Sequence, residues 1–227
     1  LAVRDHQAWL AVSPGRVSGS GQGRAEVLRV DLNDGVVTGR FGDGRADRFF
    51  GDLTLGRQDL YVSDSLNGEV LRLKGMAGPF DVLVPAGRMG SPQGLVETPD
   101  GKGLIVADYS SALWRIDLVT GEARLLAVPD NASLAGIDGL TATGNRLIAV
   151  QNGINPGRLL LITMNADWTA VAQVDLVIRT PAGENFTSGV VDDGQYVFVA
   201  RSQWSDFDEN GKAIGQGPAV IGEIPLP

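Results

Sequence analysis

The sequence predicts an all-β protein, a β-propeller built from four-stranded antiparallel blades. Short runs of residues that favour strands recur about 43 to 52 residues apart along the 227-residue chain. Further short runs accompany each of them, joined by turns that contain Gly and Asp. No segment keeps apolar residues at helical spacing for three turns without a Gly or Pro. Four strands in about 40 to 50 residues is the period of a propeller blade.

The recurring run predicts the second strand of each blade, and the runs around it predict the other strands. The second strands are expected at 8–13, 60–65, 104–109, 147–152 and 196–201. The third strands are expected at 26–31, 69–74, 112–117, 158–163 and 219–224, and the outermost strands at 36–41, 80–85, 122–128 and 170–177. The innermost strands are expected within 51–59, 93–103, 138–145 and 188–195, and residues 1–3 are expected to end one more.

These strands predict a single domain of about five blades. The approximate blades are 1–48, 49–88, 89–130, 131–182 and 183–227. A two-sheet sandwich also uses short strands at regular spacing, but it does not require one four-strand pattern to repeat five times.

Closure of the ring predicts one more blade. The first unit begins with an innermost strand that no turn precedes, and the last unit ends after its third strand. Propellers usually close with a strand from the other terminus, which leaves no long unpaired edge. We therefore expect six blades in the intact protein, with a blade and a closing strand upstream of Leu1. A closed five-bladed ring is the alternative.

Composition and charge narrow the classes of partner. With 43% hydrophobic residues, the chain can bury a substantial core. A net charge of −8 and the lack of basic runs argue against binding to nucleic acid or to an anionic membrane surface. A small-molecule substrate or ligand is the expected partner. The absence of cysteine leaves both a cytoplasmic and an exported bacterial protein open.

Two stretches carry a resemblance to a known family. They read PQGLVETPDGKGLIVADYSSALWRIDLVTGE, from residue 92, and GIDGLTATGNRLIAVQN, from residue 136. The chain resembles the senescence-marker-protein/gluconolactonase family, which includes paraoxonase-like and strictosidine-synthase-like six-bladed propellers. The resemblance implies a metal-dependent hydrolase that acts on a lactone or ester at the mouth of the central channel.

The resemblance also implies a divalent cation, most simply calcium, bound at the starts of the innermost strands. The matching positions are Asp52, Gln93 and Asp138 as metal ligands, with Asp138 also as the catalytic carboxylate. Ser188 holds the corresponding position in the last blade, and we expect all four side chains to face one mouth of the channel. Oxygen ligands from separate strands suit calcium, which takes six to eight of them. A bound cation could polarise a carbonyl and activate water.

Departures from the family pattern keep a second interpretation open. Gln93 stands where the family usually has Asn, and Gly51 precedes Asp52 where an Asn-Asp pair is common. Each carboxylate could also accept backbone N–H groups in a turn. The alternative is therefore a noncatalytic propeller that binds a small molecule or a protein. In either case Ser188 and Trp204 are the expected substrate-binding residues, Trp204 by stacking on the ligand.

Overall fold

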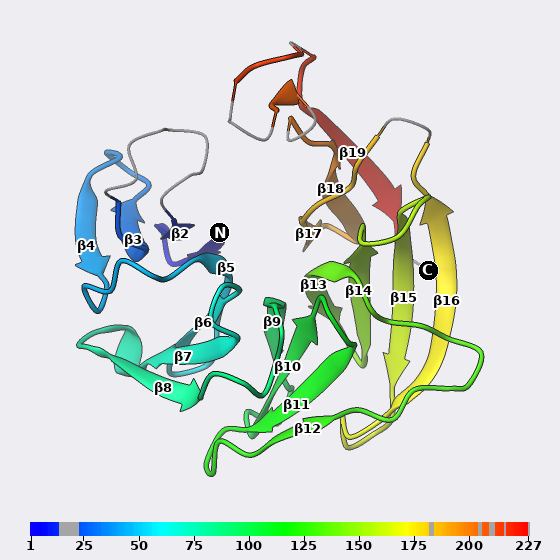
Figure 1. Cartoon of the computed structure of the whole chain (residues 1–227), viewed down its shortest axis with the longest axis horizontal. Coiled ribbons are helices and arrows are strands. Elements are labelled where there is room, and N and C mark those ends of the chain that lie inside the picture. Colours follow the sequence, from blue (N-terminus) through cyan, green and yellow to red (C-terminus); the bar gives the residue numbers. More distant parts are fainter. Residues whose placement is uncertain (14–22, 182–183, 204–205, 209–211, 216, 227) are drawn as a thin grey trace.

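The structure is a computed structural model that describes residues 1–13, 23–181, 184–203, 206–208, 212–215 and 217–226. These residues form five antiparallel sheets arranged around a centre as a β-propeller (Figure 1). The predicted fold class is therefore confirmed. The described part of the chain includes a short 3-10 turn, η2 (Lys74–Met76).

Within each sheet the strands follow chain order from the centre outward. The first sheet contains β1 (Ala2–Arg4), β2 (Gln7–Val12), β3 (Glu26–Asp31) and β4 (Val37–Phe41). The second contains β5 (Phe50–Leu55), β6 (Leu60–Asp64), β7 (Glu69–Leu73) and β8 (Phe80–Val84). The third contains β9 (Pro92–Glu97), β10 (Gly103–Asp108), β11 (Leu113–Asp117) and β12 (Ala123–Leu125). The fourth contains β13 (Ile137–Thr143), β14 (Arg146–Gln151), β15 (Arg158–Met164) and β16 (Val171–Arg179), and the fifth β17 (Gly189–Asp192), β18 (Gln195–Arg201) and β19 (Val220–Pro225).

The innermost strands lie side by side around the centre in the order β1, β5, β9, β13 and β17 (Figure 1). Between the described parts of the fifth and first sheets no strands pair. The expected sixth blade stays a prediction.

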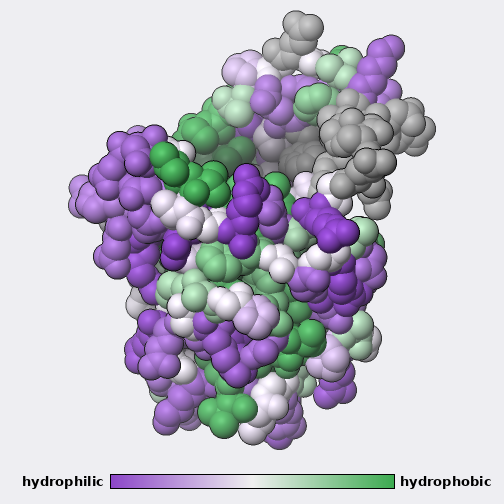
Figure 2. Space-filling view, turned by 90° about the vertical axis from the view of Figure 1, so that its left-hand side faces the viewer, coloured by the Kyte–Doolittle hydropathy of each residue, from purple (hydrophilic) through white to green (hydrophobic). Residues whose placement is uncertain are grey.

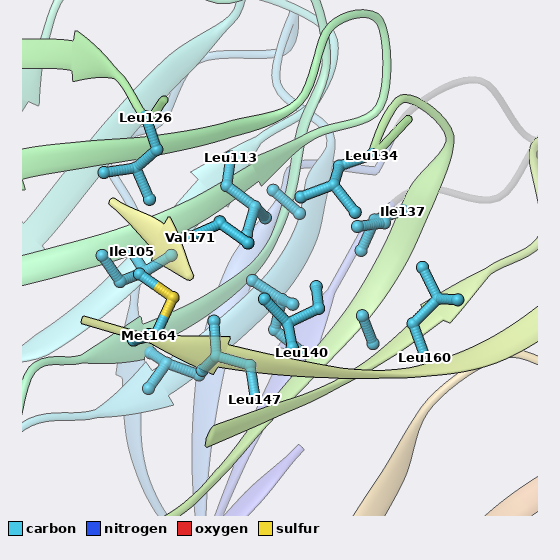
Figure 3. Close-up of a cluster of buried hydrophobic side chains, with 14 of the residues drawn as sticks. Ile105, Leu113, Leu126, Leu134, Ile137, Leu140, Leu147, Leu160, Met164 and Val171 are labelled. Atoms are coloured by element: carbon cyan, nitrogen blue, oxygen red, sulfur yellow. The ribbon is translucent and has the colours of Figure 1, made fainter. Parts of the chain in front are cut away.

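One cluster of buried apolar side chains fills each space between neighbouring sheets. The largest lies between the third and fourth sheets and includes Ile105, Leu113, Leu140 and Leu160 (Figure 3). Similar clusters join the first sheet to the second, the second to the third and the fourth to the fifth. Each fully buried side chain of this kind contributes about 1.5–3 kcal/mol. Apolar packing between sheets therefore fixes the positions of the innermost strands.

The side of the ring that lies on the left in Figure 1 carries both hydrophilic and hydrophobic residues (Figure 2). None of the helical residues in the described ranges forms a stretch long and apolar enough to cross a membrane.

Candidate functional site

Three innermost strands carry a β-bulge near their starts. Phe50 pairs with Asp64 and Leu53 with Val62, so β5 has one extra residue. The same irregularity lies in β9, between Pro92 and Leu95, and in β13, between Ile137 and Gly139. A bulge bends the strand and redirects the side chains beside it. Asp52, Gln93 and Asp138 all lie at these bulges.

In the second, third and fourth sheets, a polar residue at the end of the second strand holds the segment that leads into the innermost strand. Asp64 accepts the backbone N–H of Phe49 at 3.1 Å, and Asp108 accepts that of Ser91 at 2.7 Å. Gln151 replaces the aspartate in the fourth sheet. Its side-chain amide donates to the carbonyls of Ser133 at 3.0 Å and Ala135 at 2.6 Å, just before β13. These bonds fix the loops that lead into the bulged strands.

Asp108 is adapted to this anchoring role. Burial acts to raise the pKa of its carboxyl. Hydrogen bonds from the Ser111 hydroxyl and from the backbone of Ser91 and Gly90 outweigh burial and hold the pKa below its usual value. The carboxylate therefore stays ionised at neutral pH and keeps the loop in place.

A polar pocket opens at the end of the ring where the innermost strands begin. This mouth pocket has a volume of about 350 Å³ and is lined by Ser91, Gln93, Tyr109, Asp138, Asn152 and Asn185. Its residues come from the third and fourth sheets and from the segment before β17. Pockets of about 300–1,000 Å³ hold small organic ligands in many proteins.

Hydrogen bonds inside the mouth pocket orient Asp138. The side-chain amide of Asn152 donates to Asp138 Oδ2 at 2.8 Å and to the carbonyl of Phe186 at 3.0 Å. Gln93, which also lines the pocket, donates to the Ser91 hydroxyl at 3.1 Å. Within the described part of the chain, neither Lys, Arg nor His lines the pocket, so no described basic side chain neutralises Asp138 there.

The electrostatics of the mouth pocket follow from this lack of positive charge. Burial raises the pKa of Asp138, and the hydrogen bond from Asn152 opposes the rise. Burial also raises the pKa of Tyr109, with a further contribution from the negative charge of Asp138. A ligand that brings a hydrogen-bond donor or a positive charge to Asp138 would therefore stabilise its ionised carboxylate.

A larger cavity of about 740 Å³ follows the centre of the ring. This channel cavity is lined by residues that include Asp52, Leu53, Leu95, Leu140, Ser188 and Val190. The side chains expected to face one mouth, those of Asp52, Gln93, Asp138 and Ser188, do not all line the same cavity. Gln93 and Asp138 line the mouth pocket, whereas Asp52 and Ser188 line the channel cavity.

The bulges explain why Asp52 differs from Gln93 and Asp138. One leucine in each bulged strand holds an equivalent position: Leu53, Leu95 or Leu140. Each pairs with the residue that lies two positions before the polar end of the neighbouring second strand. Gln93 and Asp138 precede the equivalent leucine by two residues, but Asp52 precedes it by one. A shift of one residue turns a strand side chain to the other side.

Asp52 nevertheless remains within electrostatic reach of Asp138. Burial raises the pKa of Asp52 to about 6. The backbone N–H of Leu53 lowers it, while the charge of Asp138 raises it.

We expect Asp52→Asn to stabilise the protein at pH 7. A carboxyl with a folded pKa of about 6 and an unfolded pKa of about 3.9 costs stability when ionised, and that cost disappears as the pH falls through 6. Solvent screens a side chain that is 28% exposed, so the gain in unfolding free energy should be about 1 kcal/mol at pH 7 and near zero at pH 4. Urea unfolding at both pH values measures it. An equal change at the two pH values would contradict this explanation.

Sequence reasoning missed several residues of the mouth pocket. Tyr109 and Asn152 directly follow Asp108 and Gln151, the ends of two second strands, so a repeated position was available as a signal. Asn185 lies in the segment before β17. Trp204, expected to contact the substrate, lies outside the described residues.

The fold and the polar mouth pocket together define a β-propeller with a candidate ligand site at one end of its ring. No protein-family model matches the sequence, and the search of curated proteins found no match. Among solved structures, the chain is similar to one described as the nidogen/laminin complex, with 16% identity, a TM-score of 0.57 and coverage of 77% of this chain and 64% of that chain. It is also similar to the computationally designed Ika8 protein, with 11% identity, a TM-score of 0.54 and coverage of 87% and 53%. The chain thus spans less than two thirds of each, and these likenesses support the fold alone.

Proposed function

We propose that this propeller binds a small organic molecule in the mouth pocket. One observation carries the proposal: Asp138 is a partly buried carboxylate whose described partner is a neutral amide, that of Asn152. Carboxylates withdrawn from water are costly unless another group compensates them. Groups of this kind in a pocket are candidates for ligand binding.

The rest of the mouth pocket supports a specific ligand rather than a water-filled hollow. Amide and hydroxyl groups of Ser91, Gln93, Asn152 and Asn185 line the pocket with Asp138, and Tyr109 is the aromatic residue among them. A few polar groups that converge on one point fix the orientation of a small molecule. The net charge of −8 favours neutral or cationic ligands over anionic ones.

The test is a ligand screen with the wild type and Asp138→Asn. A panel of neutral sugars, alcohols and amines is screened by ligand-observed NMR, and each hit is measured by calorimetry. We expect at least one hit whose affinity falls about 10- to 100-fold in Asp138→Asn, because hydrogen bonds to charged groups contribute about 1.5–3 kcal/mol.

Asp175→Asn is the matched control, since Asp175 lies exposed on β16 of the same sheet, outside both cavities. The Asp175→Asn variant should bind each hit with the affinity of the wild type. Hits that bind both variants equally well would overturn the proposal.

A second candidate is the calcium-dependent hydrolase of a lactone or ester that the family resemblance implies. It is favoured by the mutual repulsion of Asp52 and Asp138, which a divalent cation would relieve. Asp138 and Gln93 would hold the cation through oxygen atoms. Within the described residues, however, no three His, Cys, Asp or Glu side chains gather closely enough to hold a metal. Amide and hydroxyl oxygens would have to supply most of the six to eight ligands.

When bound, calcium would supply a Lewis acid that polarises the carbonyl of the substrate. Asp138, whose pKa burial raises, would serve as the proton acceptor. Calorimetric titration of chelator-treated protein with calcium, run on the wild type and Asp138→Asn, separates the two candidates. Saturable binding lost in Asp138→Asn favours the hydrolase, and lactone hydrolysis is then the assay.

A further inference from the structure

The hydrogen bonds of the mouth pocket leave three side-chain oxygens without a described donor. Asn152 uses its side-chain N–H groups on Asp138 and on the carbonyl of Phe186. The orientation of this amide is fixed, because a carboxylate and a carbonyl can only accept. Gln93 directs its amide nitrogen to Ser91. Asp138 Oδ1, Gln93 Oε1 and Asn152 Oδ1 therefore receive no hydrogen bond from a described residue.

One aromatic residue lines the same pocket as these oxygens. Tyr109 is 37% exposed and lines the mouth pocket with Asp138. Its ring lies against the loop after β14, because a Cβ on Gly153 would stand 2.9 Å from Tyr109 Cζ. The negative charge of Asp138 acts on the tyrosine hydroxyl, so the two groups share one environment. Aromatic faces attract cations, and the attraction is greater in a site withdrawn from water.

The volume and charge of the mouth pocket limit which ligands can bind to these groups. About 350 Å³ is roughly ten times the share of one water molecule in the liquid, so the mouth pocket has room for an organic skeleton. The described groups with which Asp138 interacts electrostatically are Asp52, Tyr109 and Tyr196, and none of them carries a positive charge. An ammonium group offers three N–H donors and no acceptor.

We propose that the molecule bound in the mouth pocket carries an ammonium group, which donates hydrogen bonds to Asp138, Gln93 and Asn152 beside the ring of Tyr109. The inference rests on the proposed function and names the class of its ligand. A neutral polyol would satisfy the same acceptors but would leave the charge of Asp138 uncompensated.

A pair of probes that differ in one group tests the inference. 2-Phenylethylamine is an ammonium ion at pH 7.5, and 2-phenylethanol has nearly the same size and a hydroxyl in its place. Calorimetry or ligand-observed NMR measures both with the wild type, Asp138→Asn and the control Asp175→Asn. We expect the ammonium to bind the wild type at least about tenfold more tightly than the alcohol. The preference should vanish in Asp138→Asn and persist in Asp175→Asn.

The other outcomes separate this inference from the proposed function. If alcohols or sugars bind as tightly as amines and lose affinity in Asp138→Asn, the ammonium inference is wrong and the proposed function stands. If amines bind equally well to the wild type and Asp138→Asn, the ammonium does not pair with Asp138 and the inference is overturned. If no molecule of the screening panel binds in a manner that depends on Asp138, both proposals fail. If calcium alone binds at Asp138 and excludes the amine, the inference is overturned in favour of the metal candidate.

Discussion

Replacement of Arg48 by methionine is expected to lower the free energy of unfolding by about 3–5 kcal/mol. The Arg48 side chain is 3% exposed and lies between three carboxylates. Its Nη1 is 2.7 Å from Asp64 and 2.5 Å from Glu69, and its Nε is 2.5 Å from Asp43. Methionine fills much of the same volume but leaves Asp64 buried without its arginine partner, and leaves Glu69 with only the more distant Arg45, at 3.6 Å. Because Asp64 also holds the backbone of Phe49, the start of β5 should loosen.

Arg40→Met is the matched control for this prediction. Arg40 pairs with Glu26 at 2.5 Å, but the arginine side chain is 60% exposed. Exposed ion pairs contribute little, so unfolding free energy should change by less than about 1 kcal/mol. Urea unfolding of both variants at pH 7 measures the difference. Equal losses in the two variants would contradict a structural role for the buried cluster.

Gly94→Ala is expected to lower the free energy of unfolding by about 3 kcal/mol and to disrupt ligand binding as well. A Cβ at this position would stand 2.5 Å from the backbone nitrogen of Leu140 and 2.9 Å from the carbonyl oxygen of Asp138. Because these are backbone atoms, β9 and β13 must move apart to admit the methyl group. That movement separates Gln93 from Asp138, the two bulge residues that line the mouth pocket.

Gly144→Ala provides the comparison. Gly144 lies in the hairpin turn after β13, and a Cβ there meets nothing within 4 Å, although its φ of +60° is unfavourable for alanine. We expect Gly144→Ala to lower the free energy of unfolding by about 1 kcal/mol and to leave the ligand affinity unchanged. Thermal unfolding and calorimetry measure both quantities. Wild-type stability and affinity in Gly94→Ala would show that the two strands do not meet as closely as the structure has them.

The fold was predictable because each sheet repeats one pattern of strands. The runs that predicted β6, β10 and β14 lie within a residue of the observed bounds. Burial explains this: all residues of β6 and β10 are buried, so nearly continuous apolar runs mark them. The outermost strand expected at 122–128 is shorter, since β12 ends at Leu125 and Leu126 packs into the core between two sheets.

The candidate site was only partly predictable. The correct innermost strands were found, but the direction of each side chain depends on one extra residue in a bulge. Neither the hydrophobic pattern nor the spacing of about 41 to 50 residues between Asp52, Gln93, Asp138 and Ser188 reveals that residue. Tyr109 and Asn152 occupy equivalent positions, yet they differ in type, so comparison between blades did not single them out.

The most direct test of the account is to map where the molecule found in the ligand screen binds. Amide shifts in ¹⁵N-labelled protein are followed by NMR as that molecule is added. The account predicts that the largest shifts fall on residues 91–94, 137–139 and 152–153, around the mouth pocket. Shifts concentrated on 52–56 and 188–190, along the channel cavity, would place the ligand elsewhere and contradict the account.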